Sequence, residues 1–63
     1  MKKTFKTCYG EVVIKDVLID FENHLEEGID ILDTNGEHIT SVIGVFVYDL
    51  EVEGVEEILE NNI

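Results

Sequence analysis

Five glycines divide the chain into short segments, and this spacing limits the fold more than any other feature of the sequence. The segments between them are rich in Val, Ile and Thr, which favour strands, and no proline interrupts them. Short β-branched segments separated by turn residues are typical of antiparallel meanders. We therefore expect an α+β fold with four to five short strands, either as an open antiparallel sheet or as a partly curled barrel. The glycines are Gly10, Gly28, Gly36, Gly44 and Gly54.

The first half of the chain predicts two strands. Thr4–Tyr9 forms the first, Tyr9-Gly10 supplies a turn, and Glu11–Glu22 forms the second. Within the second strand, the apolar residues before and after Lys15-Asp16 have opposite parity, so one flat strand cannot bury both sets on one face. A bulge or bend near Lys15-Asp16 is expected to repair the phase. The two sets are Val12 and Ile14, then Val17, Ile19 and Phe21.

The middle of the chain contains the strongest hairpin signal. A polar loop is expected over Asn23–Gly28, before a strand over Ile29–Leu32. The next strand covers Glu37–Val42, and the turn Asp33-Thr34-Asn35-Gly36 joins the two. Asn and Gly tolerate positive φ, and an Asp side chain can cap such a turn.

After this hairpin the pattern changes twice. From Val42 to Tyr48 both parities are apolar, which predicts a central strand buried on both faces or a kink at Gly44. A helix is then expected over residues 53–61, because apolar residues recur at i, i+3, i+6 and i+7. These residues are Val52, Val55, Ile58 and Leu59, and the opposite face carries Glu53, Glu56, Glu57 and Glu60.

With 63 residues, the chain is expected to form a single domain, residues 1–63, with a small core. Cys8 is the only cysteine, so no intrachain disulfide can form. Cys8, His24 and His38 lack the spacing of a zinc finger, and no metal or cofactor is expected. Small domains of this kind often gain stability by self-association, so a homodimer is one expected form.

The charge is distributed very unevenly. The chain has 15 acidic and 4 basic residues, a net charge of −11, and all four lysines lie within the first 15 residues. Residues 16–63 therefore carry 14 acids without one Lys or Arg. Since 44% of the residues are hydrophobic, the composition is nevertheless globular rather than disordered. No stretch approaches the roughly 18 apolar residues of a membrane span, and a cytoplasmic location without a membrane partner is expected.

Few residues could support catalysis. Ser41 is the only serine, and Cys8 could pair only with His24 or His38. A free cysteine is usually a small buried residue rather than a nucleophile, so we expect no enzyme, and a Cys/His catalyst is only the third hypothesis. The segment from Asp33 to Gly36 resembles a calcium loop, but the residues at its first and last ligand positions are apolar.

The acidic surface is the remaining candidate. Its field repels nucleic acid, whose phosphates require Lys and Arg, so we expect a basic protein surface as partner. On the expected helix, like-charge i,i+4 pairs each cost about 0.2–0.5 kcal/mol, which argues for a selected negative face. The candidate partner-binding residues are Asp16, Asp20, Glu22, Asp49, Glu51, Glu53, Glu56, Glu57 and Glu60.

Strand geometry suggests nucleic-acid mimicry. Carboxylates at i and i+2 on a strand would lie about 6.6 Å apart and could approximate a row of phosphates, as in Asp20-Phe21-Glu22 and Asp49–Glu53. The first hypothesis is thus an inhibitor that occupies the nucleic-acid site of a partner, as anti-defence proteins of phages and mobile elements do. The second is an accessory or structural protein that acts through self-association.

Overall fold

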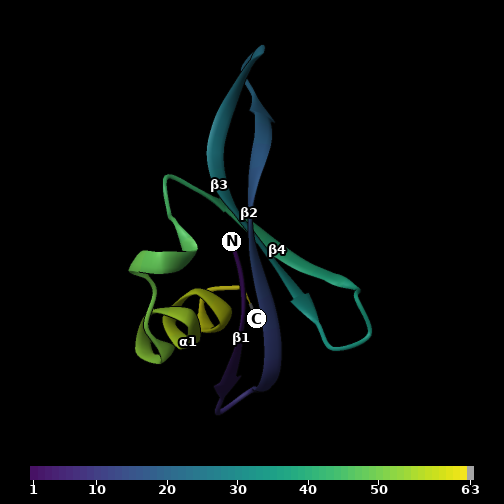
Figure 1. Ribbon diagram of the computed structural model, residues 1–63, viewed down its shortest axis with the longest axis vertical. Coiled ribbons are helices and arrows are strands. Elements are labelled where there is room, and N and C mark those ends of the chain that lie inside the picture. Colours follow the sequence, from purple (N-terminus) through teal and green to yellow (C-terminus); the bar gives the residue numbers. More distant parts are fainter. Residues whose placement is uncertain (63) are drawn as a thin grey trace.

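The computed structural model describes residues 1–62 and contains one open antiparallel sheet with a helix packed against it (Figure 1). The strand order equals the chain order, so the sheet is a simple meander. This confirms the expected α+β class, with four strands and without closure into a barrel. The elements are β1 (Lys2–Thr7), β2 (Gly10–Phe21), β3 (His24–Asp33), β4 (His38–Ile43), the 3-10 turn η1 (Val47–Asp49) and α1 (Val52–Glu60).

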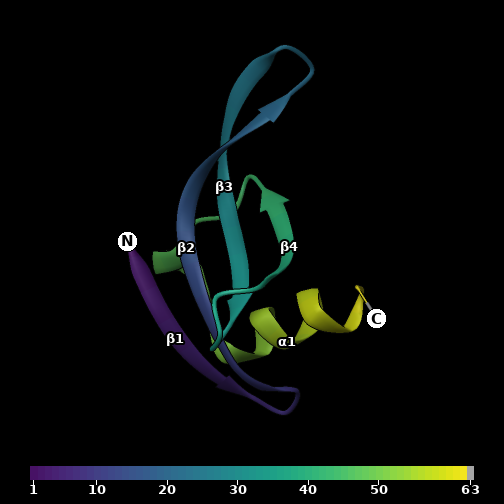
Figure 2. The same cartoon turned by 90° about the vertical axis from the view of Figure 1, so that its right-hand side faces the viewer.

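The core lies between one face of the sheet and the segment that contains η1 and α1, which lies to one side of the sheet in Figure 1 and overlaps its lower part in Figure 2. All of its fully buried side chains are apolar, and each such side chain stabilises the fold by about 1.5–3 kcal/mol. Val55 and Leu59 form the buried stripe of α1, as the helical spacing predicts. The core residues are Phe5, Val12, Ile14, Ile29 and Ile31 from the sheet, with Val47, Val55 and Leu59.

Strand β2 is regular, so the predicted bulge near Lys15-Asp16 is wrong. Its pairing with β3 runs without a shift from Val12 opposite Asp33 to Phe21 opposite His24. The two apolar sets instead occupy opposite faces of the sheet. Val12 and Ile14 are buried on the helix side, whereas the later set lies on the other face, where no helix covers it and its members are half-buried or exposed.

The predicted loop Asn23–Gly28 is also wrong, because β3 already begins at His24. The strands are joined by Glu22 and Asn23 alone, which have φ angles of 50° and 69°. Two consecutive positive φ angles match the twist of a tight hairpin. The β2–β3 hairpin therefore extends well beyond the rest of the sheet, at one end of the longest dimension of the molecule (Figure 1).

The turn after β3 forms as predicted. The Asp33 carboxylate accepts hydrogen bonds from the backbone N–H groups of Asn35 (2.8 Å) and Glu37 (2.9 Å), and Gly36 has a φ of 84°. The Asp33 side chain therefore caps a hairpin turn and is not arranged as a calcium ligand.

Beyond the turn, the chain leaves the sheet earlier than a continuous strand over Val42–Tyr48 would require. Strand β4 ends at Ile43, and Gly44 turns the chain with a φ of 82°. Of the two readings of this segment, the kink at Gly44 is confirmed and the central strand is wrong. The chain then crosses to η1 and enters α1 at Val52, one residue before the predicted helix start.

Gly28 lies where two strands approach each other too closely for any side chain. A Cβ atom at this position would stand 2.3 Å from the Val42 carbonyl oxygen and 2.8 Å from the Ile19 side chain. In α1, by contrast, a Cβ on Gly54 would meet only the Leu50 side chain, at 3.7 Å. The packing therefore requires a glycine at position 28, whereas position 54 has room for a methyl group.

We expect Gly28→Ala to destabilise the fold by about 1–3 kcal/mol, because the added methyl group forces β3 and β4 apart. The matched substitution Gly54→Ala should stabilise it by about 0.5–1 kcal/mol, since alanine favours the helix. Urea unfolding of both variants measures the two changes. A Gly28→Ala protein as stable as the wild type would contradict the close approach.

Candidate functional site

The strongest candidate surface is the acidic outer side of α1 and of the segment that leads into it. We call it the acidic helix surface, and its five carboxylate side chains are all exposed. No cation lies within ion-pair distance of any of them in residues 1–62, where the ion pairs involve only Asp16, Asp30 and Glu26. The surface therefore carries uncompensated negative charge. Its residues are Asp49, Glu51, Glu53, Glu57 and Glu60.

Glu56 belongs to the same helix but has a structural role. Its carboxylate is half-buried and accepts a hydrogen bond from the backbone N–H of Cys8 at 2.6 Å. This contact ties α1 to the β1–β2 turn. Desolvation, followed by the interaction with Glu56, raises the pKa of the Cys8 thiol. The expectation that Cys8 is a buried core residue is wrong, because Cys8 is exposed. The raised pKa nevertheless favours its unreactive thiol form.

Asp16 lies elsewhere than predicted, on the helix side of β2 rather than toward solvent. It has the parity of Val12 and Ile14, and its carboxylate is half-buried. One oxygen accepts the Val47 N–H at 3.0 Å, and the other lies 3.3 Å from the Met1 ammonium group. The hydrogen bond from Val47 is the main reason that the pKa of Asp16 is lowered, and the ammonium group adds to it. Asp16 thus joins three separate segments of the chain.

The predicted phosphate-like rows do not form on strands. Glu22 lies in the tight turn at the hairpin tip, so it does not continue a strand row from Asp20. Both residues are exposed there, far from α1 along the molecule (Figure 1). Residues 49–53 belong to η1, a short connection and the first turn of α1. The helix instead places its acids at i, i+3 and i+4, where Cβ atoms lie about 5–6 Å apart.

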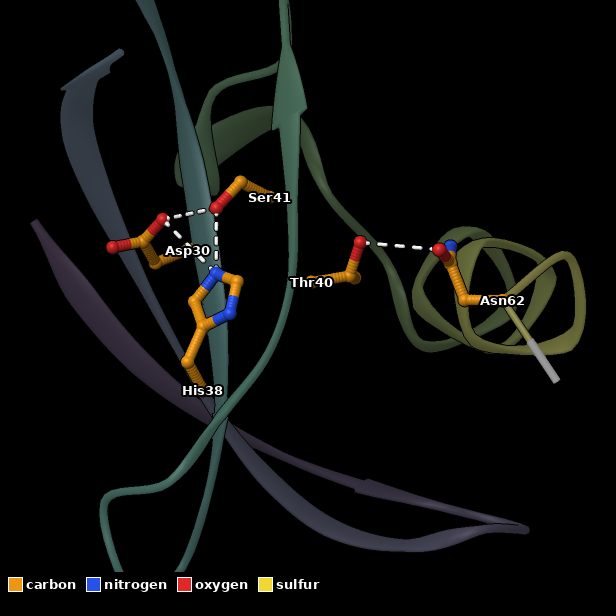
Figure 3. Close-up of polar contacts among 5 residues, drawn as sticks. All are labelled: Asp30, His38, Thr40, Ser41 and Asn62. Atoms are coloured by element: carbon orange, nitrogen blue, oxygen red, sulfur yellow. Dashed lines mark hydrogen bonds and ion pairs between the residues drawn. The ribbon is translucent and has the colours of Figure 1, made fainter.

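A second polar group, missed by the sequence analysis, lies on the sheet face opposite the helix (Figure 3). The Ser41 hydroxyl donates to the Asp30 carboxylate at 2.5 Å. The oxygen of the Ser41 hydroxyl also lies 2.7 Å from His38 Nε2. The composition matches a catalytic triad, but the order does not, since the serine lies between the other two. With its proton donated to Asp30, Ser41 can only accept from His38, and the histidine cannot act as its base.

The reason that this group was missed is the register of β3 and β4. A symmetrical hairpin about Asp33–Gly36 would pair Asp30 with Ile39. The turn already places Leu32 opposite His38, and the irregularity between Ile31 and Leu32 shifts the pairing by one more residue, so Asp30 lies opposite Ser41. Only the pairing of the strands, and no spacing in the sequence, could have revealed the contact. On the helix side of β4, the Thr40 hydroxyl donates to the Asn62 side-chain oxygen at 3.2 Å (Figure 3).

A cavity of about 370 Å³ opens at the base of the β2–β3 hairpin. Its apolar lining comes from Leu18 and from Phe46, which follows β4. Asp16 and Glu27 add carboxylates to its wall. Glu27 was not among the predicted site residues, because it was placed in a loop that is in fact strand β3. Val17 and Gly28 complete the lining.

Comparisons with protein-family models, with curated proteins and with solved structures found no match to this chain. Within residues 1–62, no group of three or more His, Cys, Asp or Glu side chains is arranged to hold a metal ion. The same residues contain no helix long and apolar enough to cross a membrane. The acidic helix surface and the cavity are therefore the features that bear on function.

The Asp16 contacts predict a pH-dependent stability difference. Because its pKa lies below the ordinary value of 3.8, the Asp16 carboxylate stabilises the fold above that pH, and this contribution is lost as the pH falls through the lowered pKa. The free energy of unfolding of Asp16→Asn should thus be lower than that of the wild type at neutral pH, and this difference should shrink below pH 3.8.

Urea unfolding at several pH values measures this difference, and Asp20→Asn serves as the matched control. Asp20 is an exposed carboxylate on the same face of β2. The stabilising role of the charge would be disproved if Asp16→Asn lowered the free energy of unfolding by the same amount from pH 7 to pH 2.5. It would also be disproved if the control lowered this free energy equally.

Proposed function

We propose that this protein is a non-enzymatic binding module whose acidic helix surface engages a basic surface of a partner protein in the cytoplasm. The observation that carries the proposal is the absence of compensating charge. None of the five exposed carboxylates of this surface has an ion-pair partner in residues 1–62. Together with the net charge of −11, this arrangement attracts a basic partner over a long range.

The energetics of the helix support a role beyond solubility. Glu53 and Glu57 are an i,i+4 pair of like charge, as are Glu56 and Glu60, and each pair costs about 0.2–0.5 kcal/mol. Lysines interspersed on the helix would keep the protein soluble without this repulsion. Since only eight apolar side chains are buried in residues 1–62, a destabilising arrangement is better explained by a requirement for negative charge.

The basic surfaces with the highest density of Lys and Arg are those that bind nucleic acid. The proposed partner is therefore a nucleic-acid-binding protein, and the module inhibits it by occupying its phosphate-binding residues. A helix that presents acids about 5–6 Å apart offers a compact group of negative charges to such a site. In this proposal, the carboxylates of a helix imitate the phosphates of nucleic acid, instead of the rows of carboxylates on strands that were first expected.

Charge reversal on the helix tests the proposal. We expect Glu57→Lys/Glu60→Lys to weaken partner binding at least about tenfold at low salt, because like charges then oppose the basic site. The fold should persist, since lysines in the last helical turn interact favourably with the helix dipole. The matched control is Glu22→Lys/Glu37→Lys, in exposed turn positions away from the helix. Both variants change the net charge from −11 by +4 to −7.

The measurement is capture from host lysate by the wild type and both variants, at low and at high salt. The partner should be retained by the wild type and by the control, be lost from the helix variant, and be released by an added DNA or RNA duplex. A partner held equally by all three proteins would show that the acids only maintain solubility. A partner that keeps its nucleic acid while bound would exclude inhibition by mimicry.

Self-association is a second candidate function, favoured by the exposed sheet edge. Strand β4 is an edge strand, and its residues from Ile39 to Ile43 include no charged side chain. Such edges pair readily with further strands. The other edge strand, β1, carries Lys2, Lys3 and Lys6, which discourage such pairing.

If this second function holds, sedimentation at micromolar concentration should show species larger than the 7.2 kDa monomer. Added salt should increase their proportion, because it screens the repulsion between acidic chains. Ile39→Lys, which charges the edge, should restore the monomer. A species of 7.2 kDa at every concentration and salt level would exclude this function.

A further inference from the structure

We infer that the cavity at the base of the β2–β3 hairpin binds a lysine or arginine side chain of the partner, an inference that rests on the proposed function and adds a specific anchor to it. The cavity is separate from the acidic helix surface, and its lining shares no residue with that surface. Its volume of about 370 Å³ accommodates a long side chain.

The cavity combines an apolar wall with a carboxylate, as a long basic side chain requires. Leu18 is 62% exposed although it lies on a strand, and Phe46 of the β4–η1 connection lines the same cavity. Leu25 lies on the same sheet face toward the hairpin tip and is also 62% exposed. These side chains form an uncovered apolar surface, on which the aliphatic stem of a lysine or arginine can lie.

Glu27 supplies the charge that selects a cation. The other acid in the wall, Asp16, already has its oxygens next to the Val47 N–H and the Met1 ammonium group. The Glu27 side chain has no such partner among residues 1–62. It projects from β3 directly opposite Leu18 on β2, so both lie on the same sheet face. No Lys, Arg or His contributes to the lining.

Other occupants fit the cavity less well. An anionic group would face the unpaired Glu27 carboxylate without a Lys, Arg or His side chain in the lining, and would be repelled. A purely apolar side chain would bury part of the Glu27 carboxylate without a partner, which costs free energy. A basic side chain satisfies the apolar wall with its stem and Glu27 with its head, and so matches both parts of the cavity.

The test uses three peptides that differ only in the central residue. Acetyl-Leu-X-Leu-amide is titrated into the ¹⁵N-labelled protein, with arginine, lysine or the neutral arginine analogue citrulline as X. We expect saturable shifts of the Leu18, Glu27 and Phe46 amide signals with the two basic peptides. The citrulline peptide should bind at least about threefold more weakly, because it lacks the charge that Glu27 attracts.

Variants of the protein locate the site. Glu27→Gln should weaken the binding of the basic peptides about threefold and remove their preference over citrulline. Glu37→Gln makes the same charge change at an exposed turn position outside the cavity and outside the acidic helix surface, and should leave the affinity unchanged. Leu18→Ser removes the apolar wall at an exposed position and should weaken the binding of all three peptides.

Equal affinity for the citrulline and arginine peptides would overturn the inference. So would shifts confined to α1, or an effect of Glu37→Gln as large as that of Glu27→Gln. These outcomes are distinct from failure of the proposed function, which depends on Glu57 and Glu60 and is measured with the whole partner. The cavity could thus bind basic peptides even if the acids of the helix served only solubility.

Discussion

Packing of the η1–α1 segment against one face of the sheet is the interaction on which the whole structure depends. Within residues 1–62, Val47, Val55 and Leu59 supply three of the eight buried apolar side chains of the core, and the sheet supplies the other five. Without this segment the sheet would have no buried face, and an antiparallel sheet alone is marginally stable in water. Since the apolar stripe of α1 must face the sheet, the glutamates on the opposite side of the helix can only point outward. The acidic surface is therefore oriented by the packing of the core.

Two acids contribute to holding this arrangement, and they differ from the exposed ones in their partners. Asp16 receives the N–H of Val47, so it ties β2 to η1, and Glu56 receives the N–H of Cys8, so it ties α1 to the β1–β2 turn. Both contacts join segments distant in sequence, and a charged acceptor makes such hydrogen bonds stronger than neutral ones. The negative charge of the chain therefore has two physical roles. Asp16 and Glu56 hold the η1–α1 segment against the rest of the fold, whereas the carboxylates of the acidic helix surface repel one another in solvent.

Local features of the sequence predict most of the architecture. The Val55–Leu59 stripe, the capped turn at Asp33 and the β-branched segments are each recognisable within a few residues. The errors concern features that only tertiary contacts determine. A glutamate at positive φ, as at Glu22, is uncommon, so a two-residue hairpin turn was not expected and Glu27 was placed in a loop. The contact between Asp30 and Ser41 depends on an irregularity between strands that leaves no periodic signal. Asp16 was expected to face solvent because it lies opposite the Val17–Phe21 set, which was taken as the buried face. In the structure, the buried face of β2 is the one that carries Asp16.

The acidic helix surface and the cavity differ in what each can add to binding. Exposed charges raise the rate of association and are screened by salt, and they add little to the lifetime of a complex. A long lifetime requires side chains that are buried on binding, usually a few anchors near the centre of the interface. The helix offers exposed charge, whereas the cavity offers an apolar wall with one free carboxylate. In the proposed mode of binding, the helix surface thus accounts for attraction of a basic partner, and retention of that partner depends on Leu18, Glu27 and Phe46.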